Sequence, residues 1–162
     1  MSKRILINGI TLDRANLVPL LLKIKDWQSK NNEITIFGTR FLKEQIDALE
    51  TIDEYEFIEL RCTHKIRNKI QFIFEATKRN ILSFFYFNKF KNNFDVVYSI
   101  SSVLDLIIFP YLLRKVDKRI KWVTVFDNIV PLSDPGNKFI RFLAWLFFQI
   151  SLILLKKRIK FL

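Results

Sequence analysis

Segments typical of β-strands alternate with segments typical of α-helices five times along this chain of 162 residues. Continuous or alternating apolar runs mark the strands, and apolar residues three or four positions apart mark the helices. This order predicts an α/β fold, a parallel sheet with right-handed crossovers and helices on both faces. The expected strands are residues 4–8, 33–37, 55–60, 94–100 and 120–126, and the expected helices are residues 16–27, 41–50, 66–90, 102–116 and 138–160.

The composition fits one domain with a core of ordinary size, because half of the residues are hydrophobic. Cys62 is the only cysteine, so a secreted scaffold held by intrachain disulfides is excluded. We interpret Cys62 as a small buried apolar residue rather than a nucleophile. Lys3 and Arg4 precede an apolar run that stops at Asn8, too early for a signal peptide. A first strand and a cytoplasmic location are therefore expected.

The expected helix over residues 66–90 carries an apolar stripe, with basic residues on its remaining surface. The stripe consists of Ile66, Ile70, Ile73, Phe74, Ile81, Phe84 and Phe85. Helical spacing of this kind favours a helix that faces the core, and contact with a membrane is the alternative. The third strand, residues 55–60, alternates polar and apolar residues and is expected near an edge of the sheet.

The formal net charge of +11 is consistent with nucleic acid, anionic lipid or phosphorylated substrates as partners. The charge is segregated: residues 44–59 hold seven acidic residues and no basic one, whereas residues 61–91 hold eight basic residues and only Glu75 as an acid. A third basic group, made of Lys138, Arg141, Lys156, Lys157, Arg158 and Lys160, brackets the most apolar segment. Basic residues beside apolar surface favour a membrane surface over nucleic acid. Solvated helix faces remain an equal alternative.

The last expected helix contains no charged residue over residues 142–155. These fourteen residues are fewer than the roughly 20 that cross a bilayer as a helix. The helix is therefore expected either to be buried within a protein or to lie in a membrane interface.

Three polar clusters each follow a strand-like segment: Asn8-Gly9, Ser99 to Ser102, and Phe126 to Asn128. In an open α/β sheet the loops at the carboxyl ends of strands line the ligand crevice, so the clusters are expected to converge there. Asp127 is the best candidate for chemistry, with a loop-closing role as the alternative. Helix capping is the default role for at least one of the serines. We expect a capping box of Ser102 and Asp105.

Several chemistries find no support in the residues. The chain has only three glycines, Gly9, Gly38 and Gly136, and lacks both the dinucleotide fingerprint and a P-loop. His64 is the only histidine, so neither a His and Cys metal site nor a triad with a histidine base is indicated.

Four segments resemble the N-terminal half of GT-B glycosyltransferases of the family-4-like group. They are Phe94 to Ser99, Leu104 to Leu106, Pro110, and Lys121 to Leu132. The resemblance implies a Rossmann-like domain on the acceptor side, facing a nucleotide-sugar domain that follows it in sequence. It departs from the family at Phe126, where a histidine is usual, and at Gly9-Ile10, where a glycine pair is usual.

Carried over residue by residue, the resemblance implies a sugar-transfer cleft with Asp127 as the catalytic residue. The residues implied to bind substrate are Asn8, Gly9, Asn16, Ser99, Ser101, Ser102, Phe126 and Asn128. No cofactor or metal is expected, and the nucleotide sugar is the donor substrate.

The whole chain, residues 1–162, is thus expected to be one acceptor-side domain, incomplete at its C-terminus and without the donor-binding domain. By itself it is not expected to transfer sugar. The expected partners are a nucleotide-sugar domain or subunit, a lipid-linked or polysaccharide acceptor, and an anionic membrane surface at the cytoplasmic face. Nucleic acid is not expected. The alternative is a non-catalytic basic α/β module that docks on anionic membrane or on an acidic partner.

Overall fold

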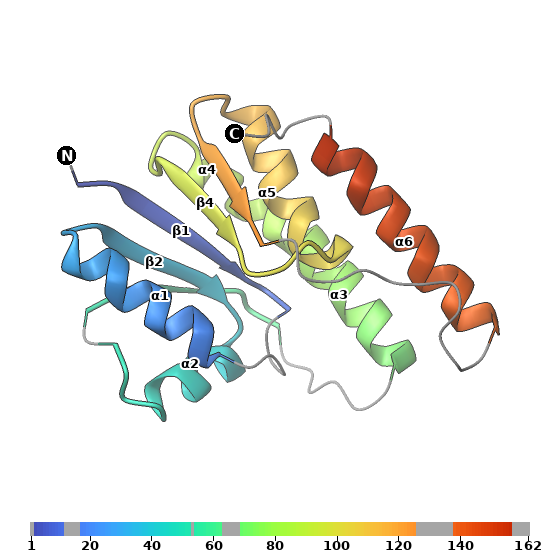
Figure 1. The fold of residues 1–162 in the computed structure, drawn as a ribbon, viewed down its shortest axis with the longest axis horizontal. Coiled ribbons are helices and arrows are strands. Elements are labelled where there is room, and N and C mark those ends of the chain that lie inside the picture. The colour runs from blue at the N-terminus through green and yellow to red at the C-terminus, as the bar shows by residue number, and fades with distance from the viewer. Residues whose placement is uncertain (1, 12–16, 53, 63–68, 126–137, 157–162) are drawn as a thin grey trace.

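The computed structural model describes residues 2–11, 17–52, 54–62, 69–125 and 138–156. Within them, five parallel strands form one sheet in the order β3-β2-β1-β4-β5 (Figure 1). The strands are β1 (Arg4–Gly9), β2 (Glu33–Gly38), β3 (Glu56–Glu59), β4 (Val96–Ser99) and β5 (Lys121–Thr124). The helices are α1 (Val18–Ser29), α2 (Arg40–Asp47), α3 (Lys69–Ser83), the 3-10 helix η1 (Phe84–Tyr86), α4 (Phe87–Phe90), α5 (Leu104–Val116) and α6 (Lys138–Lys156). The expected α/β, Rossmann-like fold is confirmed.

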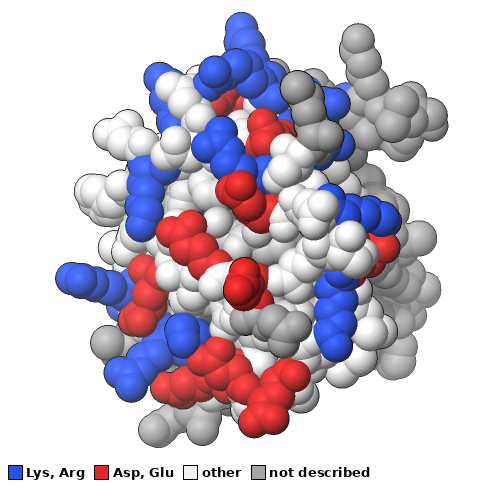
Figure 2. All heavy atoms as spheres, turned by 90° about the vertical axis from the view of Figure 1, so that its left-hand side faces the viewer, with Lys and Arg blue, Asp and Glu red and all other residues white. Residues whose placement is uncertain are grey.

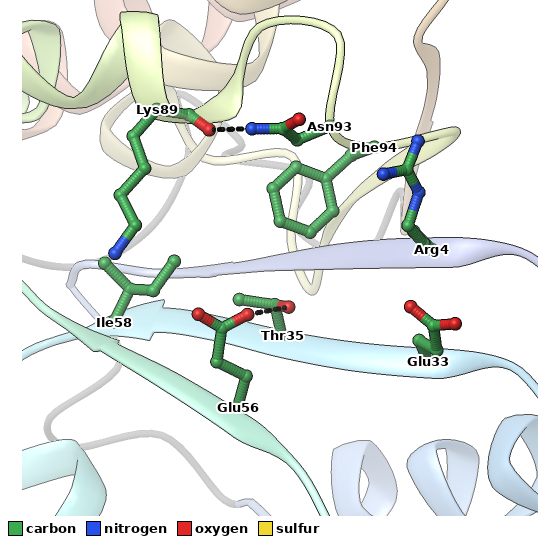
Figure 3. A pocket seen from close by; sticks show the side chains of 8 residues that line it. All are labelled: Arg4, Glu33, Thr35, Glu56, Ile58, Lys89, Asn93 and Phe94. Atoms are coloured by element: carbon green, nitrogen blue, oxygen red, sulfur yellow. Dashed lines mark hydrogen bonds between the residues drawn. The ribbon is translucent and has the colours of Figure 1, made fainter.

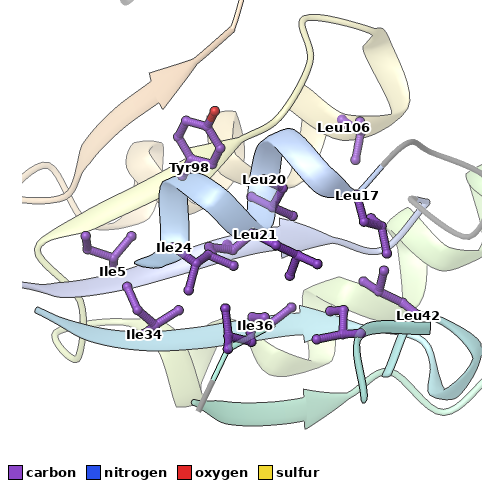
Figure 4. Packing of buried hydrophobic residues seen from close by; sticks show 13 residues of the cluster. Ile5, Leu17, Leu20, Leu21, Ile24, Ile34, Ile36, Leu42, Tyr98 and Leu106 are labelled. Atoms are coloured by element: carbon purple, nitrogen blue, oxygen red, sulfur yellow. The ribbon is translucent and has the colours of Figure 1, made fainter. Parts of the chain in front are cut away.

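Helices α1 and α2 cover one face of the sheet. The buried stripe of α1, Leu20, Leu21 and Ile24, packs with isoleucines of β1 and β2 (Figure 4). Pro19 lies in the first turn, where the missing amide costs no helical bond. The N-cap residue is Leu17 rather than the expected Asn16, which lies outside the described residues.

The opposite face carries an aromatic core. Phe37 of β2 lies 4.9 Å from Phe90 of α4 and 5.3 Å from Phe109 of α5, measured between ring centroids. Leu155 of α6 joins this cluster, and Cys62 packs against it partly buried, as a small apolar residue should. Strand β3 lies at an edge of the sheet, which confirms the expectation from its alternating sequence.

The expectation of one core-facing helix over residues 66–90 is wrong. The described part divides into α3, η1 and α4, and the described residues of the apolar stripe point outward: Phe74 is 69% exposed and Phe85 is 81% exposed. Among the side chains of α3 that the structure describes, the buried ones are instead mostly polar, namely Glu75, Ala76, Arg79, Asn80 and Ser83. The reason is tertiary: the inward side of α3 meets polar groups at the carboxyl ends of the strands, as described below.

Helix α6 ends at Lys156 in the described part of the chain, and it has one buried side and one exposed apolar side. Ser151 and Leu155 are buried, whereas Phe142 and Ile153 are more than half exposed. Among the described helices, none is long and apolar enough to cross a membrane.

Candidate functional site

The order in which strands are added to the sheet reverses between β1 and β4. From β1 the chain builds outward to β2 and β3 on one side, and β4 and β5 occupy the other. Such a switch point separates the loops that follow its two strands and leaves a crevice, which is where open α/β sheets bind ligands. The register pairs Asn8 of β1 with Ser99 of β4 at this point, so two of the predicted residues lie side by side.

Asn8 and Ser99 are completely buried and bind the same backbone carbonyl. Asn8 Nδ2 donates to Leu106 O at 2.7 Å, and Ser99 Oγ donates to it at 3.2 Å. Ser99 Oγ also accepts from Trp122 Nε1 at 3.2 Å. These bonds fix the first turn of α5 on the sheet. Both side chains therefore position the crevice wall, and their contact with a ligand stays a prediction.

Gly9, Ser101 and Ser102 lie at the same edge and are buried. Gly9 pairs with Gly38 in register. A Cβ atom added at Gly38 would stand 3.2 Å from Gly9 O and 2.6 Å from Leu42 Cδ2, so any larger residue at this position would force Leu42 to shift. Thr124 Oγ1 donates to Ser101 O at 3.0 Å, which ties the loop after β4 to β5. The structure thus brings the first two predicted clusters together.

The expected capping box of Ser102 and Asp105 is wrong. The N-cap residue of α5 is Val103, in extended conformation and without a side-chain cap, and its N–H is 3.4 Å from Ser101 Oγ. Asp105 cannot reach back to cap the helix, because its carboxyl group lies against the side chain of Thr11. Burial raises the pKa of Asp105, and the nearby hydroxyl group of Thr11 opposes part of that shift.

Helix α3 contributes two charged residues to this edge that the sequence analysis missed. Arg79 is 1% exposed, and its Nη1 donates to Ile10 O at 3.1 Å, in the loop after β1. Glu75, one helical turn earlier, is 3% exposed. Its Oε1 lies 4.0 Å from Lys78 Nζ, and its Oε2 has no hydrogen-bond partner among the described residues.

Asn80 joins α3 to α5 at the same edge. Its Nδ2 donates to Asp105 O at 3.0 Å and to Ala76 O at 2.9 Å. The signal that could have revealed these residues was Glu75, the only acid between residues 61 and 91, within four positions of Arg79.

The remaining predicted residues, Asn16, Phe126, Asp127 and Asn128, lie outside the described residues, as does His64. The predicted convergence of the third cluster with the first two therefore stays a prediction.

The carboxyl edge thus combines three charged residues beside the loops after β1 and β4. They are Asp105, whose carboxyl group has a raised pKa, and the buried Glu75 and Arg79. A carboxyl group of this kind can accept or hold a proton, and perturbed groups of this kind are concentrated at functional sites. No group of three or more His, Cys, Asp and Glu side chains in the described segments could hold a metal ion.

A separate pocket of about 200 Å³ opens at the amino ends of β1, β2 and β3 (Figure 3). Arg4 and Lys89 line it together with Glu33 and Glu56, and Thr35 Oγ1 donates to Glu56 Oε2 at 3.0 Å. The surrounding edge is rich in charges of both signs, which Figure 2 shows in spheres. This pocket lies at the opposite end of the sheet from the predicted site.

Comparisons with known proteins identify the fold. No protein-family model matches the sequence, and no curated protein matches it either. Among solved structures, the chain is similar to a UDP-N-acetylglucosamine 2-epimerase, with 16% identity and a TM-score of 0.50 over 93% of this chain and 37% of the other.

Two glycosyltransferases are similar in the same way. The calicheamicin glycosyltransferase CalG4 has 12% identity and a TM-score of 0.53 over 98% of this chain and 41% of its own. The glycosyltransferase of kitacinnamycin has 11% identity and a TM-score of 0.57 over 96% of this chain and 38% of its own. This chain thus spans about two fifths of each neighbour. It has the α/β, Rossmann-like fold found in these GT-B neighbours.

Proposed function

We propose that this chain is the acceptor-side domain of a GT-B glycosyltransferase of the family-4-like group, working in polysaccharide biosynthesis. One observation carries the proposal: nearly the whole chain superposes on two fifths of two glycosyltransferases, with its switch-point edge built from buried polar residues. In this function a nucleotide-sugar domain or subunit supplies the donor, and the acceptor is a lipid-linked or polysaccharide hydroxyl at the cytoplasmic face of a membrane.

The contribution of this domain to the reaction is to position the acceptor. The loops after β1 and β4 would hold the acceptor hydroxyl in the crevice, with Asn8, Gly9, Asn16, Ser99, Ser101, Ser102, Phe126 and Asn128 around it. Asp127 would take the hydroxyl proton as the sugar is transferred. The nucleotide-sugar domain would stabilise the departing diphosphate through its dipoles and basic groups.

Asp105 is a second candidate for the proton acceptor in the same crevice. Its buried carboxyl group lies beside the loop after β1, and its raised pKa brings proton uptake closer to neutral pH. Asp127 and Asp105 are distinguished by the separate variants Asp127→Ala and Asp105→Ala.

The test measures transfer of radiolabelled sugar from nucleotide sugars to membrane lipid extracts, with a nucleotide-sugar domain supplied. Asp127→Ala should lower turnover by about 100-fold or more, the contribution of a general base, without changing the circular dichroism spectrum. Asp26→Ala, at an exposed position on α1, is the matched control and should leave turnover unchanged. The chain without a donor domain should show no repeated turnover.

An unchanged rate in Asp127→Ala and in Asp105→Ala, with transfer present, would assign the chemistry to other residues. Absence of any transfer with the donor domain supplied would favour the second candidate function, a non-catalytic module that docks on a membrane or acidic partner. The exposed apolar side of α3 is the observation that favours this alternative.

A further inference from the structure

Helix α3 and η1 present a largely apolar surface to the outside of the domain. This surface, the α3 apolar face, consists of Ile73, Phe74, Ile81, Phe84 and Phe85, which are between 39% and 81% exposed. Their helical spacing places them on one side, opposite the buried Glu75 and Arg79. A group of exposed apolar side chains on one side of a helix is typical of an interaction site.

The inward side of α3 is fixed by polar contacts, so the helix cannot turn its phenylalanines into the core. Arg79 Nη1 binds Ile10 O, and Asn80 Nδ2 binds Asp105 O. Rotation of the helix would break both hydrogen bonds and would move the buried side chains of Glu75 and Arg79 out of the protein interior. The outward orientation of the α3 apolar face is therefore built into the fold.

The exposed charge on the described part of α3 is positive. Glu75 is the only acid between residues 61 and 91, and it is 3% exposed, so it contributes almost nothing to the surface. Lys78 of α3, one helical turn after Phe74, is partly exposed. An apolar face bordered by Lys78 and free of exposed acid on its own segment fits an anionic lipid surface.

We propose that the α3 apolar face is a membrane-docking surface that inserts Phe74 and Phe85 into the interface of an anionic bilayer. A second copy of this chain fits less well, because each copy has a net charge of +11 and like charges would meet. The inference depends on this surface and not on sugar transfer, so it can hold where the proposed function fails.

Docking through this face would also place the crevice near the membrane. Arg79 links the middle of α3 to Ile10, at the start of the loop after β1. Figure 1 shows the first turns of α3 on the side of the molecule to which the strands point, and the helix then runs back along the sheet towards α4. An acceptor anchored in lipid would therefore be presented to the carboxyl edge of the sheet.

The first experiment measures co-sedimentation of the purified chain with vesicles of phosphatidylcholine alone or mixed with phosphatidylglycerol. The double variant Phe74→Glu, Phe85→Glu should bind the anionic vesicles at least about tenfold less than the unmodified chain, because two inserted rings are lost. The control Leu22→Glu, Leu49→Glu makes the same change in net charge at two exposed leucines outside α3, and should change binding less than about twofold.

A second measurement covers the case in which the double variant does not fold. Phe85→Trp adds a single reporter at the most exposed phenylalanine of the face. Its extra fluorescence should shift to the blue on anionic vesicles and be quenched by brominated lipid, and raised salt should weaken both effects.

The proposal is overturned if the unmodified chain does not bind anionic vesicles, binds neutral ones equally well, or loses as much binding in the leucine control. It is also overturned if the indole introduced by Phe85→Trp stays in water on the vesicles. Light scattering that shows a dimer, dissolved by the phenylalanine variant, would assign the face to a second copy. Binding of an acidic protein without vesicle binding would assign it to a protein partner.

Discussion

The two edges of the sheet differ in how far their cationic side chains are buried. At the carboxyl edge, Arg79 and Glu75 are almost completely buried, and the Asp105 carboxyl group is enclosed beside Thr11. At the amino edge, Arg119 is exposed and pairs with Asp117, whose carboxylate also accepts from the N–H groups of Asn92 and Arg119. At the carboxyl edge the cation is thus enclosed by protein, whereas at the amino edge the buried carboxylate of Asp117 pairs with a cation that lies in water.

This difference indicates where the fold has given up stability for another purpose. Burying charged and amide groups costs free energy unless every bond is satisfied, and Glu75 Oε2 and Asn8 Oδ1 lack partners among the described residues. Such costs are typical of functional sites. The amino edge, by contrast, needs only to join the turns before β4 and β5, which Asp117 does.

The largest effect is expected from the two arginines. Arg79→Met removes the buried bond from a charged group to Ile10 O and leaves that carbonyl unsatisfied, so we expect a loss of about 3 kcal/mol in the free energy of unfolding. Arg119→Met removes an exposed partner of Asp117 and should cost much less. Urea denaturation followed by circular dichroism measures both. Equal losses would remove the distinction between the edges.

Two asparagines, one at each edge, test the same comparison, and the expected losses in the free energy of unfolding are of intermediate size. Asn8→Ala removes the buried 2.7 Å bond to Leu106 O and should cost about 2 kcal/mol. Asn93→Ala removes an exposed bond to Lys89 O at the amino edge and should cost about 0.5 kcal/mol or less. The same urea titrations provide the values. A larger loss in Asn93→Ala than in Asn8→Ala would contradict the assignment of Asn8 to the support of α5.

The smallest effects are expected from two aspartates, with opposite signs in their pH dependence. The Arg119 guanidinium and backbone N–H groups lower the pKa of Asp117 to about 2, below its ordinary value of 3.8. A lowered pKa in the folded state means that Asp117 stabilises the protein above pH 3.8 and loses this contribution as the pH falls towards about 2. Asp117→Asn should therefore lower the urea midpoint at neutral pH and flatten its decline in acid.

Asp105 should behave in the reverse way, because burial raises its pKa in the folded state. Its protonated form fits the fold, so the stabilisation is present below the ordinary value of 3.8 and is lost as the pH rises through the raised pKa. Asp105→Asn should raise the urea midpoint at neutral pH and leave it unchanged in acid. Asp26→Asn, exposed on α1, serves as the control for both. A midpoint that falls in Asp105→Asn at neutral pH would show that the carboxylate is stabilised where it lies.

Much of the fold could be predicted because it follows from local patterns. The strands β1 and β2 and the helix α1 appeared within two residues of their expected bounds, since apolar runs and the stripe of Leu20, Leu21 and Ile24 leave one way to bury them. The edge position of β3 followed from its alternation. The pairing of Asn8 with Ser99 followed from their places at the ends of parallel strands.

By itself, then, the sequence determined the order of elements, the two covered faces of the sheet and the edge at which polar loops meet, because hydrophobic burial acts through spacing along the chain. Only the tertiary structure decided which side of α3 faces inward and where Asp105 points. Hydrophobic spacing favoured burial of Phe74 and Phe85, but the bonds of Arg79 to Ile10 and of Asn80 to Asp105 join residues more than twenty positions apart. Such long-range polar contacts leave no periodic signal, and here they decide the orientation of the helix.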